Sequence, residues 1–243
     1  MLQRSTLPSP PPLDGLERLA LFLDFDGTLV DIADGPDAID VPDDLGQRIA
    51  ALSNRLDGRL AVVTGRSLDN LEQFLGLCPV YRAGSHGAHV VTPQGEALQA
   101  AKALPEAVIN QLSDFAQANG LLYERKPHGG ALHYRAKPEL EAQVKAISTQ
   151  IADEHGLAAK SGKCVVELVW PGADKGGATR LLADQPECAN ATPIFIGDDV
   201  TDEDGMLAAK ELGGFGIAVG ERPSDAATYH LSTVKDVHTW LKL

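Results

Sequence analysis

Short apolar runs alternate with helical patterns along most of the chain. Mainly apolar stretches of four to five residues, typical of buried parallel strands, occur at 19–23, 60–63, 80–83, 193–196 and 216–219. After the first stretch apolar residues recur at helical spacing over 45–56, and a further helix is predicted over 67–75. This alternation favours an α/β fold whose core is a doubly wound, mostly parallel sheet.

A different pattern occupies the middle of the chain. Helices are predicted around 105–118 and 139–154, and strands at 121–125, 131–135 and 163–170. The glycine-containing segment 126–130 joins the first two strands into a hairpin, which a purely parallel sheet lacks. We therefore predict an α+β domain inserted over 99–172, with a core domain formed by 1–98 and 173–243. Within the core, residues 1–15 are expected to be a stiff, proline-rich and poorly ordered lead.

The segment Asp24-Phe25-Asp26-Gly27-Thr28 directly follows the first predicted strand. In open α/β sheets, ligands bind just past the carboxyl ends of the strands. Alternate residues of an extended chain share a side, so Phe25 should point away while Asp24 and Asp26 converge on one small group. Gly27 permits a sharp turn, and the amides around it can cradle an anion. Two carboxylates repel an anion unless a cation intervenes, so the segment predicts a metal site.

Further polar residues follow other predicted strands or begin a helix. They are Thr64, Asp198, Asp199, Asp202 and Lys175. Together with the first segment they suit phosphoryl transfer through an aspartyl-phosphate, with Asp24 attacking phosphorus. Asp26 would protonate the leaving alkoxide and then activate water. Carboxylates would hold a hard cation, with Mg²⁺ preferred for its octahedral oxygen ligation, while Thr64, Lys175 and loop amides neutralise the phosphate oxygens.

Two other metal- or phosphate-binding patterns fail on their spacing. Residues 200–211 match four positions of a calcium-binding loop, but Val200 would stand first and cannot ligate a metal. The segment 156–162 has one residue too many for a phosphate-binding P-loop, and Cys164 stands where that motif needs Ser or Thr.

In order and spacing these segments resemble the haloacid dehalogenase superfamily of phosphatases. The resemblance rests on 24–28, Thr64, Lys175 and 197–202 and covers the whole core domain. It implies that Asp24 is the nucleophile and Asp26 the acid/base. It also implies a metal held by the Asp24 carboxylate, the Asp26 main-chain carbonyl and Asp198, with Asp199 and Asp202 supporting these ligands. Phosphate contacts would come from Thr64, Gly65 and Lys175.

The predicted insert is similar to the cap domains of sugar phosphatases in this superfamily. Segments 84–88, 124–126, 132–135, 162–167 and 171–176 resemble the trehalose-6-phosphate phosphatase family in particular. The resemblance implies Mg²⁺-dependent hydrolysis of trehalose 6-phosphate to trehalose and phosphate. Sugar contacts would come from His86, Gly87, Glu124, Lys126, His133, Arg135, Lys163 and Glu167. His89, where the family suggests Glu, and Thr64, where Ser is more usual, depart from the pattern.

Composition limits the partners of such an enzyme. The 243 residues carry a formal charge of −13, which argues against nucleic acid or an anionic membrane surface as partner. Cys78, Cys164 and Cys188 have no metal-ligand spacing and fit reduced thiols. No apolar run reaches membrane-spanning length, and we expect a cytoplasmic monomer that acts on a small sugar phosphate.

Two alternatives to this function remain open. The first is a phosphatase for another sugar phosphate, with the same core and a different cap specificity. The second is a non-catalytic phosphoacceptor or binding module similar to a receiver domain, which also places Asp residues at strand ends. The joint presence of Asp24, Asp26, Lys175 and Asp198, together with an elaborate insert, disfavours the second alternative.

Overall fold

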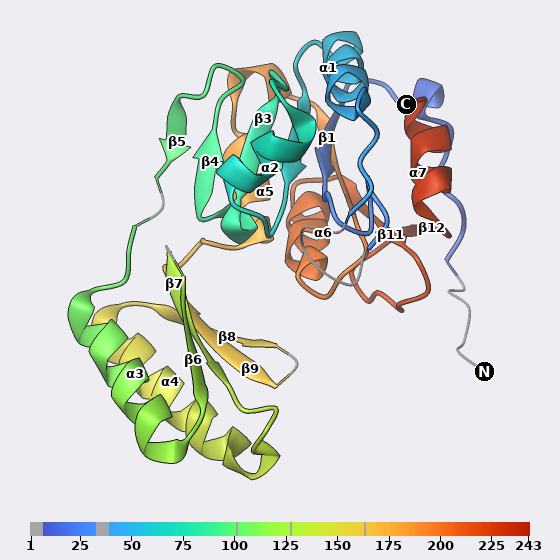
Figure 1. Ribbon diagram of the computed structural model, residues 1–243. Coiled ribbons are helices and arrows are strands. Elements are labelled where there is room, and N and C mark those ends of the chain that lie inside the picture. Colours follow the sequence, from blue (N-terminus) through green and yellow to red (C-terminus); the bar gives the residue numbers. More distant parts are fainter. Residues whose placement is uncertain (1–6, 33–38, 101, 127, 163) are drawn as a thin grey trace. The chain divides into compact units, whose positions relative to one another are not determined.

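A computed structural model describes residues 7–32, 39–100, 102–126, 128–162 and 164–243 (Figure 1). The chain divides into two compact units, one formed by 1–100 together with 174–243 and the other by 101–173. We call the first the core unit and the second the insert, and each is described by itself. No helix within the described ranges is long and apolar enough to cross a membrane.

The core unit contains a central sheet with the strand order β12-β11-β10-β1-β2-β3-β4-β5 among the described residues. Its strands are β1 (Leu19–Leu23), β2 (Leu60–Val63), β3 (Tyr81–Gly84), β4 (His89–Val91), β5 (Ala97–Gln99), β10 (Thr192–Gly197), β11 (Phe215–Val219) and β12 (Tyr229–Leu231). Pairing is parallel from β12 to β3 and antiparallel at β4 and β5. The predicted α/β class with a doubly wound, mostly parallel sheet is therefore confirmed.

Helices cover both faces of this sheet. They are α1 (Leu45–Arg55), α2 (Leu68–Leu75), α5 (Lys175–Ala183), α6 (Asp202–Glu211) and α7 (Val234–Leu241), with short 3₁₀ turns η1 (Leu13–Gly15), η2 (Ser85–Gly87) and η4 (Pro186–Cys188). Alternate residues of β1 enter different apolar clusters: Leu21 packs with Ile49 of α1, and Phe22 packs with Leu182 of α5. All five β1 side chains are buried, which explains why its sequence is apolar throughout.

The amino-terminal lead is more ordered than expected where the structure describes it. Residues 1–6 lie outside the described residues, but Leu13 in η1 is buried against the core. The indole N–H of Trp240 in α7 donates to the Pro11 carbonyl at 2.8 Å, and the His230 amide donates to the Pro8 carbonyl at 3.0 Å. Prolines that fix the backbone lower the entropy lost when the lead docks, and Leu13 supplies an apolar anchor.

The insert packs two helices on one face of an antiparallel sheet with the strand order β6-β7-β9-β8. Its elements are α3 (Glu106–Asn119), β6 (Leu122–Lys126), β7 (Gly129–His133), η3 (Pro138–Leu140), α4 (Glu141–His155), β8 (Ala158–Gly162) and β9 (Val165–Val169). Leu132 and Leu168 point into the cluster that also contains Leu112 of α3 and Val144 of α4. Glu124 and Glu167, which lie in one row with Ala131, belong to the opposite face of the sheet.

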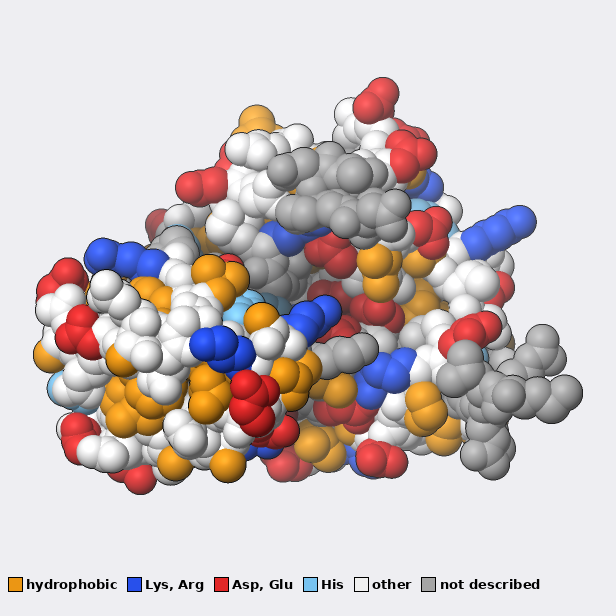
Figure 2. Space-filling view, turned by 60° about the horizontal axis from the view of Figure 1, so that its bottom comes forward, with side chains coloured by type: hydrophobic (Ala, Val, Ile, Leu, Met, Phe, Trp, Pro, Cys, Tyr) orange, Lys and Arg blue, Asp and Glu red, His pale blue; other side chains and the backbone are white. Residues whose placement is uncertain are grey.

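The space-filling view shows acidic side chains at many places on the visible surface, as expected from the net charge of −13 (Figure 2).

Candidate active site

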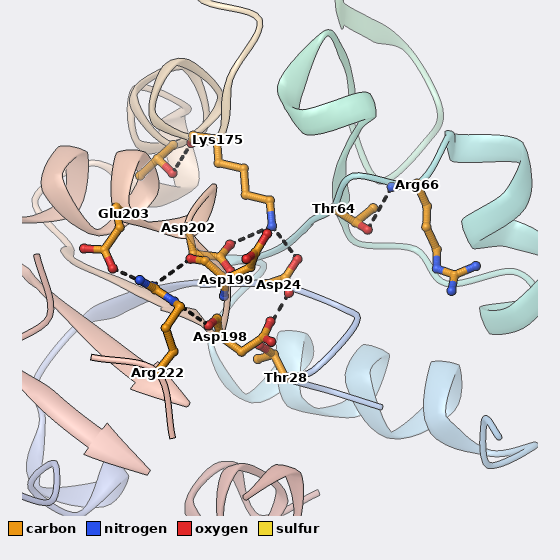
Figure 3. Close-up of polar contacts among 11 residues, drawn as sticks. Asp24, Thr28, Thr64, Arg66, Lys175, Asp198, Asp199, Asp202, Glu203 and Arg222 are labelled. Carbon is orange, nitrogen blue, oxygen red and sulfur yellow. Dashed lines mark hydrogen bonds and ion pairs between the residues drawn. The ribbon is translucent and has the colours of Figure 1, made fainter. Parts of the chain in front are cut away.

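The carboxylate of Asp24 lies buried at the carboxyl end of β1. Its backbone amide continues the sheet by donating to the Ile196 carbonyl of β10 at 2.9 Å, and the residue is only 4% exposed. The ammonium group of Lys175 donates to Asp24 Oδ1 at 2.6 Å and to Asp202 Oδ1 at 2.6 Å (Figure 3). Lys175 is the first residue of α5, where Asp174 caps the helix by accepting from the Gly177 amide at 2.7 Å. The helix start therefore fixes where this buried cation reaches.

Burial dominates the electrostatics of this group. Desolvation raises the pKa of Asp24 well above its usual value, and the nearby Asp202 carboxylate adds to the rise while Lys175 opposes it. Burial also works against the charged form of Lys175, but Asp24 and Asp202 outweigh it and raise the pKa of the ammonium group. Lys175 therefore stays protonated and offers a permanent positive charge beside the Asp24 oxygen.

A second group of carboxylates follows β10. One oxygen from each of Asp24, Asp198 and Asp202 lies within 4.8 Å of the others. Burial, with Asp202 and Asp199 nearby, raises the pKa of Asp198 to about 6. The backbone of Gly27 approaches so closely that an added Cβ would lie 2.3 Å from Asp198 Oδ2. Crowded, partly desolvated carboxylate oxygens form the ligand set that a hard divalent cation prefers, so the residues present fit Mg²⁺.

The three carboxylates differ in what they already bind. Both Asp202 oxygens accept hydrogen bonds, Oδ1 from Lys175 and Oδ2 from the Asp199 amide at 2.9 Å. Asp24 accepts from Lys175 at Oδ1, but at Oδ2 it accepts only from the Thr28 hydroxyl at 3.5 Å, so this oxygen is less firmly engaged than either oxygen of Asp202. The metal-ligand roles inferred for Asp24 and Asp198 therefore suit the geometry better than such a role for Asp202. Asp202 instead holds Lys175 and the turn after β10.

The structure pairs Asp26 with a partner that Asp24 does not share. Arg66 donates to both Asp26 oxygens, from Nη2 at 2.6 Å and from Nε at 2.7 Å. Its guanidinium also stacks over Phe74 at 4.9 Å, and in Figure 3 it points away from the Asp24 cluster. Asp24 and Asp26 therefore bind different partners here and do not share one group. Strict alternation requires extended chain, but β1 ends at Leu23 and the chain soon turns at Gly27 with a φ of 78°.

The loops after β2 and β3 lie against each other. Thr64 is buried, and its hydroxyl accepts from the Arg66 amide at 3.1 Å while its carbonyl accepts from the His86 amide at 2.9 Å. A Cβ added to Gly65 would lie 2.6 Å from Cε1 of His86, so the imidazole covers this glycine. Gly87, at a φ of 101°, approaches the Asp174 carbonyl too closely for any side chain. The structure thus brings Thr64, Gly65, His86 and Gly87 together.

Four of the six residues predicted as sugar contacts in the insert form cross-strand pairs on the helix-free face of its sheet. His133 Nε2 lies 2.9 Å from Glu124 Oε2, and Lys126 Nζ lies 3.0 Å from Glu167 Oε1. Arg135 does not share a strand face with His133 as expected, because β7 ends at His133 and Arg135 occupies the exposed turn that follows. Lys163 lies outside the described residues. The predicted sugar-contact set is therefore only partly brought together by the structure.

Comparison with known proteins decides the family. The sequence model described as trehalose-phosphatase matches residues 22–236. The chain belongs to the trehalose-phosphatase family. It is 35% identical over 237 residues to a trehalose-6-phosphate phosphatase of Escherichia coli K12, covering 93% of this chain and 86% of that protein. It is 37% identical over 212 residues to a probable trehalose-phosphate phosphatase of Sinorhizobium fredii, covering 84% and 79%.

Solved structures agree with this trehalose-phosphatase assignment. A trehalose-6-phosphate phosphatase of Aspergillus fumigatus superposes with a TM-score of 0.78 at 25% identity, covering 97% of both chains. The C-terminal domain of a Candida albicans trehalose-6-phosphate phosphatase gives a TM-score of 0.74 at 22% identity and so supports the fold alone. The predicted resemblance to trehalose-phosphatases and the predicted class, a phosphoric monoester hydrolase, are confirmed.

Two arginines that contact site residues, Arg66 and Arg222, were not predicted from the sequence. Arg66 follows the predicted phosphate contacts Thr64 and Gly65, and nothing in the sequence pattern indicates that it binds Asp26. Arg222 follows β11 in a segment without periodicity, yet it contacts the loop that carries Asp198 and Asp199. The sequence signal for each of them is a basic residue that lies near a predicted strand end in an acidic chain.

Proposed function

We propose that this trehalose-phosphatase hydrolyses trehalose 6-phosphate to trehalose and inorganic phosphate through an aspartyl-phosphate on Asp24, with Mg²⁺ as cofactor. The observation that carries the proposal is the buried Asp24 carboxylate, held at 2.6 Å by a lysine that also binds Asp202. The names of the relatives support the choice of sugar. Burial supports the chemistry, because a desolvated carboxylate next to a fixed cation is a poised nucleophile for an anionic phosphate.

The first step transfers the phosphoryl group to the protein. An Asp24 oxygen attacks phosphorus, and the bond from phosphorus to the sugar oxygen breaks. Asp26 delivers its proton to that oxygen as trehalose leaves. Both Asp26 oxygens accept from Arg66 in this structure, so at least one of these hydrogen bonds has to be given up first. Lys175 stays charged beside Asp24 and offsets the negative charge that gathers there.

The second step frees the phosphate. Asp26, now deprotonated, takes a proton from a water molecule, whose oxygen attacks the phosphorus of the aspartyl-phosphate. The acyl phosphate bond breaks, and Asp24 is regenerated as a carboxylate. The Thr64 hydroxyl, whose oxygen accepts from the Arg66 amide, can donate its proton to an oxygen of the transferred group, whereas the amides of Gly27 and Thr28 already donate within their own turn. When bound by Asp24 and Asp198, Mg²⁺ would screen the charge of the phosphate and fix its orientation.

Recognition of the sugar is assigned to the insert and to the loop after β3. The pairs Glu124–His133 and Lys126–Glu167 offer both donors and acceptors, which a polyhydroxyl ligand requires. His86 and Gly87 complete the set, with Lys163 and Arg135 as further candidates from the sequence. A phosphatase for a different sugar phosphate would share the core chemistry and differ in these residues.

A phosphate-release assay tests the proposal. Trehalose 6-phosphate, glucose 6-phosphate, sucrose 6-phosphate and an aryl phosphate are compared at equal concentration, with and without chelator. We expect multiple turnovers, a clear preference for trehalose 6-phosphate, loss of activity on chelation, recovery with Mg²⁺ and poor recovery with Ca²⁺, whose larger, looser shell spoils the geometry. Release of one equivalent only would indicate a phosphoacceptor module. Preference for another sugar would reassign the substrate, and full activity in metal-free buffer would remove the cofactor.

A further inference from the structure

Arg222 forms hydrogen bonds with the loop that joins β10 to α6. Its Nε donates to the Asp198 carbonyl at 3.0 Å, and its Nη2 donates to the Asp199 carbonyl at 2.9 Å and to Glu203 Oε1 (Figure 3). Its Nη1 donates to the Pro223 carbonyl at 2.9 Å, within its own segment. Three donor nitrogens of one planar group are thereby engaged, which is a geometry that only a guanidinium supplies.

These contacts fix the peptide unit between Asp198 and Asp199 at both of its polar ends. The carbonyl of this unit accepts from Arg222, and its amide N–H donates to Asp202 Oδ2 at 2.9 Å. A peptide plane held on two sides cannot rotate about the flanking bonds without losing a hydrogen bond. Because the Asp198 Cα borders this plane, the direction of its Cα–Cβ bond, from which the carboxylate extends, is constrained as well.

Glu203 ties the segment that carries Arg222 to α6. One carboxylate oxygen accepts from Arg222, and the other accepts from the Ser224 hydroxyl at 3.0 Å and the Ala226 amide at 2.9 Å. Hydrogen bonds therefore join two segments that are distant in the sequence, 198–203 and 222–226. Arg222 and Glu203 are both partly buried, with side-chain exposures of 31% and 20%.

We infer that Arg222 is a positioning residue that holds Asp198 in the direction needed to ligate Mg²⁺. This inference rests on the proposed function, because it takes Asp198 as a metal ligand. Arg222 itself contacts neither metal nor phosphate in this assignment. Outer partners of metal ligands set ligand direction, and their loss typically weakens metal binding about 10- to 100-fold.

Direct titration of Mg²⁺ into the metal-free, full-length protein by calorimetry tests the inference without an activity readout. We expect Arg222→Met to raise the Mg²⁺ dissociation constant about tenfold or more. Arg222→Lys retains the charge without the fork and should recover only a small part of this loss. The matched control is Arg180→Met, which breaks the exposed Arg180–Glu211 pair (2.6 Å) involving the last residue of α6 and should leave the constant unchanged.

Each outcome decides the matter. A folded Arg222→Met variant with parental affinity would overturn the inference. Parental affinity in Arg222→Lys would overturn it too, because a charge without the forked hydrogen bonds would then suffice. If Arg222→Met does not fold, Arg222→Lys decides by the same criterion. Failure of the parent protein to bind Mg²⁺ would instead overturn the cofactor in the proposed function. At saturating Mg²⁺ the variants should approach the parental kcat, whereas a general loss of structure would lower kcat at every metal concentration.

Discussion

Ion pairs of nearly equal length occur in the core unit and in the insert, but their surroundings differ. Lys175 lies 2.6 Å from Asp24, with side-chain exposures of 3% and 5%. In the insert, Lys145 lies 2.6 Å from Glu141, with exposures of 47% and 49%. The core pair is shielded from water, so its charges interact strongly through a low dielectric, whereas solvent screens the charges of the surface pair. Distance alone therefore says little about what a charged contact does.

The two units also assemble their polar residues differently. The core cluster takes Asp24 from the end of β1, Asp202 from the start of α6 and Lys175 from the start of α5. The polar face of the insert comes from neighbouring strands in simple register, where Glu124, Ala131 and Glu167 form one row. Convergence of distant segments in a buried place suits bond making, and a half-exposed row on a sheet suits recognition of hydroxyl groups.

The largest effect is expected from Asp24→Asn. The amide keeps the shape of the side chain but removes the attacking charge, so kcat should fall by about a thousandfold or more on trehalose 6-phosphate and on an aryl phosphate alike. Steady-state phosphate release measures both. Asp153→Asn, the same substitution at an exposed site in α4, should leave both rates unchanged. Activity above a small percentage of the parent in Asp24→Asn would exclude Asp24 as the nucleophile.

One substitution in each lysine pair tests whether burial makes the Lys175 pair matter more for stability than the Lys145 pair. Lys175→Met leaves Asp24 and Asp202 without their cation, and we expect it to lower the free energy of unfolding by about 3–5 kcal/mol in chelator at neutral pH. Lys145→Met is expected to leave that free energy unchanged, because its pair is exposed. Urea unfolding followed by circular dichroism measures both. Equal losses in the two variants would mean that burial does not separate the pairs.

The substitution Glu167→Ala tests whether the insert recognises the sugar. Loss of a charged contact to the sugar should lower kcat/KM on trehalose 6-phosphate by about 30-fold, corresponding to about 2 kcal/mol. An aryl phosphate has no sugar to hold and should be turned over at the parental rate. Glu154→Ala, on the exposed surface of α4, should affect neither substrate. Equal loss on both substrates would point to a folding defect, and no loss on either would remove Glu167 from the sugar site.

Much of the fold follows from local sequence pattern. The bounds of β1 and β2 match their predicted ranges, because uninterrupted apolar runs end there at Asp24 and Thr64. The short strand β4 and its neighbour β5 at the edge of the sheet were not predicted, since each has three residues and β5 is partly exposed. The second strand of the insert was predicted at 131–135 but spans Gly129–His133. Its glycines suggested a turn, whereas an added Cβ at Gly130 would lie 2.9 Å from the hydroxyl of Tyr123.

The candidate site was predictable where strand ends determine it. Asp24, Lys175 and Asp202 meet because parallel strands and the following helices present their ends at one edge of the sheet. The partners of individual side chains were not predictable. The pairing of Asp26 with Arg66 depends on the turn at Gly27, and the grip of Arg222 depends on a loop that has no periodic pattern. Both are tertiary contacts that local rules do not encode.

The smallest effect concerns pH and separates buried from exposed carboxylates. The pKa of Asp198 is raised to about 6 by burial first and by Asp202 next, from the value of 3.8 that it has when exposed. The folded protein therefore binds this proton more tightly than the unfolded chain does. Its stabilising effect is fully present below about pH 4 and is lost as the pH rises through about 6. Asp24 and Asp202, whose pKa values are also raised, act in the same direction.

In chelator, the Asp198→Asn variant should consequently lose less stability than the parent between about pH 4 and pH 7. The difference is expected to be on the order of 1 kcal/mol, once solvent screening of this partly exposed group is taken into account. Urea unfolding at a series of pH values measures it, with Asp153→Asn as the exposed control that should follow the parent. Saturating Mg²⁺, which binds the ionised carboxylate, should remove the parent's loss and leave the variant unchanged. Parallel pH profiles for Asp198→Asn and the parent would show that Asp198 is solvated like a surface carboxylate, and the contrast between the two units would then rest on Asp24, Lys175 and Asp202 alone.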